Sequence, residues 1–357
     1  WARPEFPFGC PVTSMDPLEY RRRLHEARRA TGCWLHYLLW RCGVLFSEPQ
    51  AVKEVLAPRI TLDKSERRIG KVLRVWGALF GQAIFMVGPK QWKRQHRIIL
   101  RALGTRHTAS FFETAERDAD EIVEGLRVRH AAAREQQYNT GLREEFTEYT
   151  IGVIMKIILG AKFEGLRELV RDTEWVMECQ SDPWFLLPGY LELPFGKPRQ
   201  VREAIRRLHG TIQSIVDEKR RELAADPQAL RQKPTLTLLE RLCCAEEADE
   251  DPLTAEEVVH NVFGLVAAGF DTTSTALTHI CFMLAEHQTL QQQIFEELQS
   301  LHSDAAPDAG ERWQALDAQP RLTAFICECL RLYPSIIGTV YRTTTEAVQV
   351  GDAHLPK

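Results

Sequence analysis

The stretch Ala267-Ala268-Gly269-Phe270-Asp271-Thr272-Thr273 lies inside the longest unbroken helical pattern of this 357-residue chain. Thr254 and Glu257 form a Thr-x-x-Glu capping box that predicts where the helix begins, and the pattern continues to about Glu286. A helix of this length spans roughly 50 Å at about 1.5 Å per residue. Apolar residues lie on most of its sides, which predicts burial through the centre of a domain. These residues are Val258, Val259, Val262, Phe263, Leu265, Val266 and Leu277.

The same stretch weakens this helix at one place. Gly269 in a helix interior costs about 1 kcal/mol relative to Ala, and the adjacent Thr272 and Thr273 are β-branched. We expect the Thr272 hydroxyl to bond the carbonyl of Ala268, which bends helices. Small residues let a flat ligand approach the backbone, and Asp271 beside hydroxyls supplies a proton donor and a relay. The residues alone leave two interpretations equally open: a functional site, or a helix-packing contact that needs a small face.

A second motif pairs opposite charges in a late helix. Glu328 and Arg331 are three residues apart and therefore share one helical face. Most pairs of this kind are solvated surface bridges that contribute little stability. The neighbouring apolar residues, from Phe325 to Tyr333, favour a buried pair that needs further hydrogen-bonding partners. The surface bridge is the alternative.

A third motif lies in a predicted helix over Lys90–Leu103. Trp92 and His96 are four residues apart on one face, and both side chains donate hydrogen bonds. The face with its basic neighbours can hold carboxylates or dock an acidic partner. Without context, a basic surface helix is the favoured interpretation, and Arg342 gains significance only if this helix binds an anion nearby. The basic neighbours are Lys93, Arg94, Arg97 and Arg101.

Composition narrows the class of protein. The chain is 44% hydrophobic and 26% charged, with a formal net charge of −4. These values argue against a disordered chain and against a bulk nucleic-acid binder. The nine cysteines have scattered spacing and no Cys-x-x-Cys pair, so neither a disulfide framework nor a zinc site is expected. No apolar run is long enough to cross a membrane, and no signal peptide is visible.

The remaining pattern predicts a mainly α protein with small sheets, organised as a single large irregular domain over residues 1–357. Short strands are expected between Leu35 and Phe46 and again between Thr339 and Val350. Ser47 is expected to cap a short helix, and Gly160 to end another. The segment 182–198 is predicted to be an apolar loop and the acidic segment 246–251 a solvated loop. Further helices are predicted over 47–56, 109–126, 146–159, 166–180, 200–225, 289–301 and 320–333.

Taken in order, these motifs resemble those of the cytochrome P450 family, the haem-thiolate monooxygenases. The stretch from Ala268 to Thr273 is similar to the oxygen-binding motif of the family's long central helix. Glu328-Cys329-Leu330-Arg331, followed by Leu332-Tyr333-Pro334, resembles its Glu-x-x-Arg helix. Trp92 and His96 resemble the residues that bind a haem propionate, and Arg342 lies where members place another propionate-binding Arg. The resemblance extends from about Leu35 to Lys357 and implies the cytochrome P450 fold.

The resemblance implies haem (heme, iron-protoporphyrin IX) as the cofactor and gives each motif a role. Thr272 would hydrogen-bond the dioxygen and Asp271 would help to relay protons, so both are catalytic candidates. Ala268 and Gly269 would leave room for the oxygen. Glu328 and Arg331 would stabilise the core structurally, and Trp92, His96 and Arg342 would anchor the propionates.

One element of the family is missing from the sequence. No cysteine lies in a Phe-x-x-Gly-x-x-x-Cys-x-Gly loop, which carries the iron ligand of the family; Cys327 and Cys329 belong to the Glu-x-x-Arg helix. The resemblance places that loop beyond Lys357, so no metal ligand is assigned. We interpret the chain as an inactive fragment of a monooxygenase, incomplete at both ends. A haem-free, non-catalytic helical binding protein of P450-like shape is the alternative.

The resemblance also implies partners. The substrate would be a lipophilic small molecule that reacts with O2, and electrons would come from NADPH through a reductase or a ferredoxin. Phe85, Met86 and the loop from Trp184 to Leu187 lie where the family builds its access channel. The basic residues of the Trp92 helix would dock the electron donor, and no nucleic-acid partner is expected. A eukaryotic protein would be tethered to the cytosolic face of the endoplasmic reticulum membrane by an N-terminal anchor, and a bacterial one would be cytoplasmic.

Overall fold

The computed structural model of the chain describes residues 22, 33–38, 41–46, 48–57, 62–63, 74–103, 108–132, 141–160, 165–180, 182–226, 236–248, 251–299, 301, 308–336 and 342–356. The chain divides into two compact units. The first unit comprises Trp1–Trp92, Arg171–Leu208 and Val340–Lys357, and the second comprises Lys93–Val170 and His209–Thr339. Three boundaries between them fall inside helices: α5 (Pro89–Leu103), α8 (Leu166–Cys179) and α9 (Gly196–Ala225).

The first unit holds the strands that the structure describes. They form two-stranded antiparallel sheets in which β1 pairs with β2, β3 with β4, and β5 with β6. Gly351 makes the turn between β5 and β6 at a φ of 52°, a left-handed conformation that favours glycine. The bounds are β1 (Cys33–Leu38), β2 (Arg41–Phe46), β3 (Leu62–Asp63), β4 (Thr343–Thr344), β5 (Val348–Val350) and β6 (Ala353–Leu355).

Helices of the first unit supply its core. Phe80 of α4 (Arg74–Phe80) and Phe185 of the 3-10 helix η2 (Pro183–Leu186) are buried. The helix α2 (Pro49–Leu56) is tied to the β5–β6 turn, because a carboxylate oxygen of Glu54 accepts from the backbone N–H of Gly351 at 2.9 Å. Apolar side chains from its helices therefore contribute to the core of this unit.

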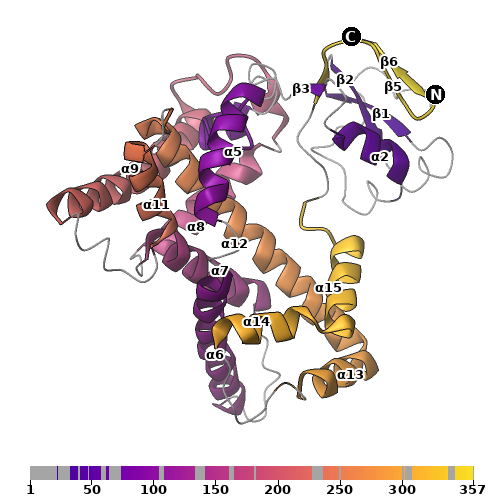
Figure 1. Cartoon of the computed structure of the whole chain (residues 1–357). Coiled ribbons are helices and arrows are strands. Elements are labelled where there is room, and N and C mark those ends of the chain that lie inside the picture. Colours follow the sequence, from indigo (N-terminus) through magenta and orange to yellow (C-terminus); the bar gives the residue numbers. More distant parts are fainter. Residues whose placement is uncertain are drawn as a thin grey trace. The chain divides into compact units, whose positions relative to one another are not determined.

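The second unit is built around α12 (Ala255–Glu286), the long orange helix of Figure 1. It packs against α7 (Leu142–Leu159), whose Ile151, Met155 and Ile158 are each 1% exposed. Lys156 of α7 forms an ion pair with the buried Asp118 at 2.6 Å, which holds α7 against α6. The other helices are α6 (Thr108–Ala132), α11 (Leu238–Ala248), α13 (Gln288–Gln299), α14 (Ala309–Asp317) and α15 (Pro320–Leu332).

Most predicted elements are confirmed. The capping box of Thr254 and Glu257 is present at the start of α12, which ends at the predicted Glu286. Gly160 ends α7 with a φ of 80°, as its position after an apolar helix indicates. Strands occur where alternation predicted them in both Leu35–Phe46 and the tail. The residues from 337 to 341, including Tyr341, lie outside the described part of the chain.

Several local predictions were wrong. Glu48, not Ser47, caps α2, because its carboxylate accepts from the backbone N–H of Ala51 at 2.8 Å. The acidic segment 246–251 is not entirely a loop, since α11 continues to Ala248. The loop over 182–198 contains η2, and α9 begins at Gly196. Helices α4, α11 and α14 were not predicted, because helices of two or three turns contain too few residues to give a clear periodicity.

Candidate functional site

The N-terminal half of α12 is anchored by a buried carboxylate. Glu257 is 1% exposed and completes the capping box by accepting from the backbone N–H of Thr254 at 2.8 Å. It also pairs with Arg94 of α5, and Gln95 Nε2 donates to its Oε1 at 3.2 Å. Arg94 Nη1 additionally reaches Asp251 Oδ1 at 3.1 Å. This half of the helix is therefore fixed by charge-assisted hydrogen bonds as well as by apolar packing.

The helix opens to solvent one turn later. Every residue from Glu257 to Gly264 is buried, whereas Ala268 is exposed and Thr272 is partly exposed. Thr272 Oγ1 donates to the carbonyl oxygen of Ala268 at 2.7 Å, as the sequence predicted. Because the two residues are four apart, they lie on the same face, and the hydroxyl oxygen is held at an accessible surface just after the buried N-terminal half of the helix.

Gly269 faces a different direction. A Cβ atom at this position would lie 2.8 Å from Cγ1 of Ile154 in α7, closer than real Cβ atoms approach. The helix-packing interpretation therefore describes Gly269, which lets α12 and α7 approach closely. Ala268 and Thr272 lie on another, accessible face of the helix, and the functional-site interpretation of these two residues stays a prediction.

Hydroxyl groups surround the backbone of this turn. Thr150 Oγ1 of α7 lies 3.1 Å from the carbonyl oxygen of Phe270, and Ser274 Oγ donates to that of Asp271 at 3.1 Å. Ser335 Oγ donates to the carbonyl oxygen of Thr272 at 2.8 Å. The sequence analysis missed Thr150 and Ser335. No local signal marks them, because each lies more than sixty residues away from its acceptor along the chain.

Asp271 points to the start of α7. Its Oδ1 lies 3.3 Å from Arg143 Nη2, and the two side chains are 31% and 50% exposed. A pair this accessible is weakened by solvent and salt. The carboxylate is therefore oriented by Arg143 without being locked by it.

Glu328 and Arg331 form the predicted pair, but the expectation of burial was wrong. Two hydrogen bonds of 2.7 and 2.5 Å join them, and their side chains are 54% and 65% exposed. The hydrogen bond from Arg331 lowers the pKa of the Glu328 carboxyl. The apolar residues of α15 lie on its other side, where Phe325 and Cys329 pack with Ile294 of α13. Apolar neighbours in sequence do not bury a pair when they face the opposite side of the helix.

The predicted propionate-binding residues lie on two elements. Trp92 and His96 share one face of α5, and Trp92 is exposed. Arg342 directly precedes β4 in the first unit and is partly exposed. The basic face of α5 needs a correction, because Arg94 is only 19% exposed and is engaged with Glu257 and Asp251. The exposed basic residues of this face are Lys93, Arg97 and Arg101.

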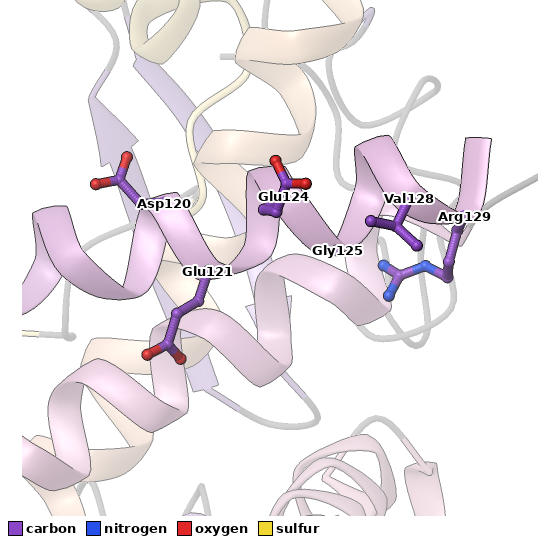
Figure 2. Close-up of a pocket in the computed structure, with 6 residues that line it drawn as sticks. All are labelled: Asp120, Glu121, Glu124, Gly125, Val128 and Arg129. Atoms are coloured by element: carbon purple, nitrogen blue, oxygen red, sulfur yellow. The ribbon is translucent and has the colours of Figure 1, made fainter. Parts of the chain in front are cut away.

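A shallow open pocket lies along α6 (Figure 2), and its lining residues are none of the predicted site residues. One helix supplies its whole lining, which includes the carboxylates of Asp120, Glu121 and Glu124. Arg129 at its end pairs with Glu145 at 2.7 Å. Its acidic face is that of a solvated helix.

None of the helices that the structure describes is long and apolar enough to cross a membrane. Among the described residues, no group of three or more His, Cys, Asp or Glu side chains is arranged to hold a metal ion.

Comparison with known proteins places this geometry in a family. The family model described as Cytochrome P450 matches residues 15–357. The chain is 24% identical over 334 residues to the probable cytochrome P450 4s3 of Drosophila melanogaster, covering 88% of this chain and 62% of that protein. It is 23% identical over 344 residues to cytochrome P450 4F5 of Rattus norvegicus, covering 91% and 62%. It therefore spans about three fifths of the length of these curated relatives.

The fold agrees with this match. The crystal structure of the cytochrome P450DA heme domain superposes with a TM-score of 0.76 at 19% identity, covering 99% of this chain and 74% of that one. The predicted mainly α fold with small sheets is confirmed. The matched region includes the whole of α12 and α15, where the two most specific motifs lie. The chain belongs to the cytochrome P450 family.

Proposed function

We propose that the protein acts as a haem-dependent monooxygenase on a lipophilic small molecule. One oxygen atom of O2 would enter a C–H bond of the substrate, and the other would leave as water after taking up two electrons and two protons. The observation that carries this proposal is the Thr272 hydroxyl, held on the accessible face of α12 beside a carboxylate, directly after the buried N-terminal half of the helix. A proton relay needs such a hydroxyl and acid next to each other at an accessible surface.

The residue types present suit a haem. Ala268 presents only a methyl group at the exposed turn of α12, so a flat macrocycle can approach the helix backbone there. Trp92, His96 and Arg342 would hold the propionates through N–H donors, which suit carboxylates. When bound, a thiolate-ligated haem supplies the oxidising chemistry. None of the sequence's cysteines has the Phe-x-x-Gly-x-x-x-Cys-x-Gly context of the family's iron ligand, so these residues describe the oxygen side of the site.

The chain's own groups would move protons and exclude water. Thr272 donates its proton to the Ala268 carbonyl, which leaves the oxygen lone pairs directed to the open face. Asp271 is partly exposed and can exchange protons with solvent, while Arg143 orients its carboxylate. The buried apolar side chains of Val262, Phe263, Val266 and Phe270 would keep bulk water from the covered sides of the helix.

Substrate and electron supply follow from surface chemistry. Phe85, Met86 and the segment from Trp184 to Leu187 are apolar and suit a lipophilic substrate. Electrons would come from NADPH through a reductase or a ferredoxin. Lys93, Arg97 and Arg101 form an exposed basic face on α5 that suits an acidic donor protein. Arg94 takes no part in this docking, because Glu257 and Asp251 engage it.

An association with the cytosolic face of the endoplasmic reticulum membrane is part of the proposal. Trp184 and Phe195 are 61% and 66% exposed on the segment between α8 and α9, and Leu187 is also exposed. Large apolar side chains left in contact with water suit the interface of a lipid bilayer.

The first test is replacement of the hydroxyl. In the haem-loaded full-length protein, Thr272→Ala is expected to reduce product formed per O2 consumed by about 100-fold or more, the lower end of the typical contribution of general acid–base groups. The matched control is Thr278→Ala, since Thr278 makes the same bond to the carbonyl four residues earlier, at 2.8 Å. Product yield should be unchanged in the control.

The outcomes separate the candidate functions. Unchanged product yield in Thr272→Ala would refute the role of this hydroxyl. A failure of the wild-type protein to bind haem, followed by its Soret absorbance during titration, would refute the monooxygenase. The haem-free binding protein would then be the better description.

A further inference from the structure

Five carbonyl oxygens of α12 accept hydroxyl hydrogen bonds between Ala268 and Ser274. Three of the donors belong to α12 itself: Thr272, Ser274 and Thr278. The other two, Thr150 and Ser335, come from elements far away in sequence. Their acceptors, Phe270 and Thr272, lie on either side of Asp271.

Ser335 is the better placed of the two outside donors. The structure gives its hydroxyl one acceptor, the Thr272 carbonyl oxygen at 2.8 Å. The Thr150 hydroxyl has a single proton but lies 2.8 Å from the carbonyl oxygen of Phe146 in its own helix and 3.1 Å from that of Phe270. Since the nearer acceptor competes for this proton, the bond from Thr150 to α12 is the weaker one.

Packing fixes the position of Ser335. Tyr333 caps the C-terminus of α15, and its ring stacks on His279 of α12 with a centroid distance of 5.1 Å and an interplanar angle of 21°. Pro334 follows and restricts the backbone before Ser335. The aromatic contact thus holds the end of α15 against α12. In this position the Ser335 hydroxyl reaches the turn that carries Asp271 and Thr272.

We infer that Ser335 is a positioning residue for Thr272, with Thr150 as a weaker auxiliary from α7. Gly269 and the β-branched threonines make this turn intrinsically weak as a helix. The Ser335 hydroxyl offsets that weakness by holding the Thr272 peptide group, which sets the direction of the Thr272 side chain. The functional part of this inference rests on the proposed monooxygenase; the structural part does not.

The structural part is tested by amide hydrogen exchange of the full chain. Ser335→Ala is expected to speed exchange across Leu265–His279 by about 5- to 10-fold, the effect of losing one net hydrogen bond. Thr150→Val should have a smaller effect, and exchange over Ala255–Gly264 serves as the internal reference. Ser335→Thr and Thr150→Ser keep the hydroxyls and should restore wild-type exchange. Unchanged exchange in Ser335→Ala would overturn the inference.

The functional part is tested by turnover of the haem-loaded full-length protein. Ser335→Ala is expected to lower product per O2 by about 3- to 10-fold with little change in KM, and Ser335→Thr should recover it. A raised KM with an unchanged product yield would mean that Ser335 contacts substrate, which overturns the positioning role. If the wild type shows no turnover, the monooxygenase proposal fails, and the exchange experiment still decides whether Ser335 holds the turn.

Discussion

Two successive segments of α12 differ in burial and in how their charged side chains are paired. From Glu257 to Ala267 every residue except Leu265 is buried, and the carboxylate of Glu257 is engaged by Arg94, Gln95 and the helix cap. From Ala268 to Thr273 the helix is partly exposed, and its ion pair, Asp271 with Arg143, is accessible to water. The first segment anchors the helix, and the second leaves the hydroxyl of Thr272 and the carboxylate of Asp271 accessible to solvent.

Removal of the anchor should have the largest effect. Glu257→Ala leaves Arg94 and Gln95 without their buried acceptor and removes the capping box, so we expect a loss of about 3 kcal/mol or more in the free energy of unfolding. Urea denaturation followed by circular dichroism measures this loss. The control is Glu256→Ala, because Glu256 is 66% exposed in the same helical turn. Equal losses in both variants would mean that burial of Glu257 does not set its contribution.

A methyl group at the packed glycine should have the next largest effect. In Gly269→Ala the new Cβ meets Ile154, so overpacking of about 1–3 kcal/mol outweighs a gain in helix propensity of about 1 kcal/mol. The control, Gly152→Ala in α7, places its Cβ in open space and should stabilise the protein by about 0.5–1 kcal/mol. In an Ile154→Ala background, Gly269→Ala should become stabilising, which denaturation of the four variants tests. A loss that persists there would place the strain elsewhere.

The buried histidine of the first segment predicts a pH dependence. Burial lowers the pKa of His260 below its ordinary value, and the charge of nearby His209 lowers it further, against an opposing effect of Glu256. The unfolded chain therefore binds more protons than the folded one as pH falls through about 6.5, so stability is full above this pH and decreases below it. His260→Gln should show a smaller loss of stability between about pH 7 and pH 5. If His260→Gln loses as much stability as the wild type between these pH values, His260 is not the source of the pH dependence.

The accessible pair of the second segment should have the smallest effect on stability. Arg143→Gln is expected to change the free energy of unfolding by no more than about 0.5 kcal/mol, because both side chains are substantially hydrated. Denaturation at low and high salt measures it. A loss close to that of Glu257→Ala would show that the two segments are anchored alike, contrary to the comparison drawn above.

The sequence correctly predicted the features that depend only on neighbouring residues in the chain, such as helix caps and helix ends. The capping box of α12, the C-terminal glycine of α7, the proline at the start of α15 and the bond from Thr272 to Ala268 each depend on residues within four positions. They were confirmed because backbone hydrogen bonding over that range is nearly independent of tertiary context. The site roles assigned to Asp271, Thr272, Trp92, His96 and Arg342 stay predictions.

Long-range partners were missed or misjudged. Arg94 was taken for part of an exposed basic face, yet it pairs with Glu257, which lies 163 positions away. Glu328 and Arg331 were judged from apolar neighbours that point to α13 instead. In both cases exposure depends on which face of the helix is covered by another element. Periodicity identifies the apolar face of a helix but not the elements that cover its other faces.

The sequence by itself determined the mainly α architecture, the length of the central helix, its weak point at Gly269 and the order of motifs that identifies the family, whereas the predicted burial holds only for the N-terminal half of that helix. Only the tertiary structure decided that Gly269 packs on Ile154, that Ala268 and Thr272 face outward, and that Ser335 and Thr150 reach the backbone of the same turn. The physical reason is the range of the interactions. Helix propensity and capping act within a turn, whereas exposure and hydroxyl donation from α7 and from the end of α15 depend on how separate helices pack.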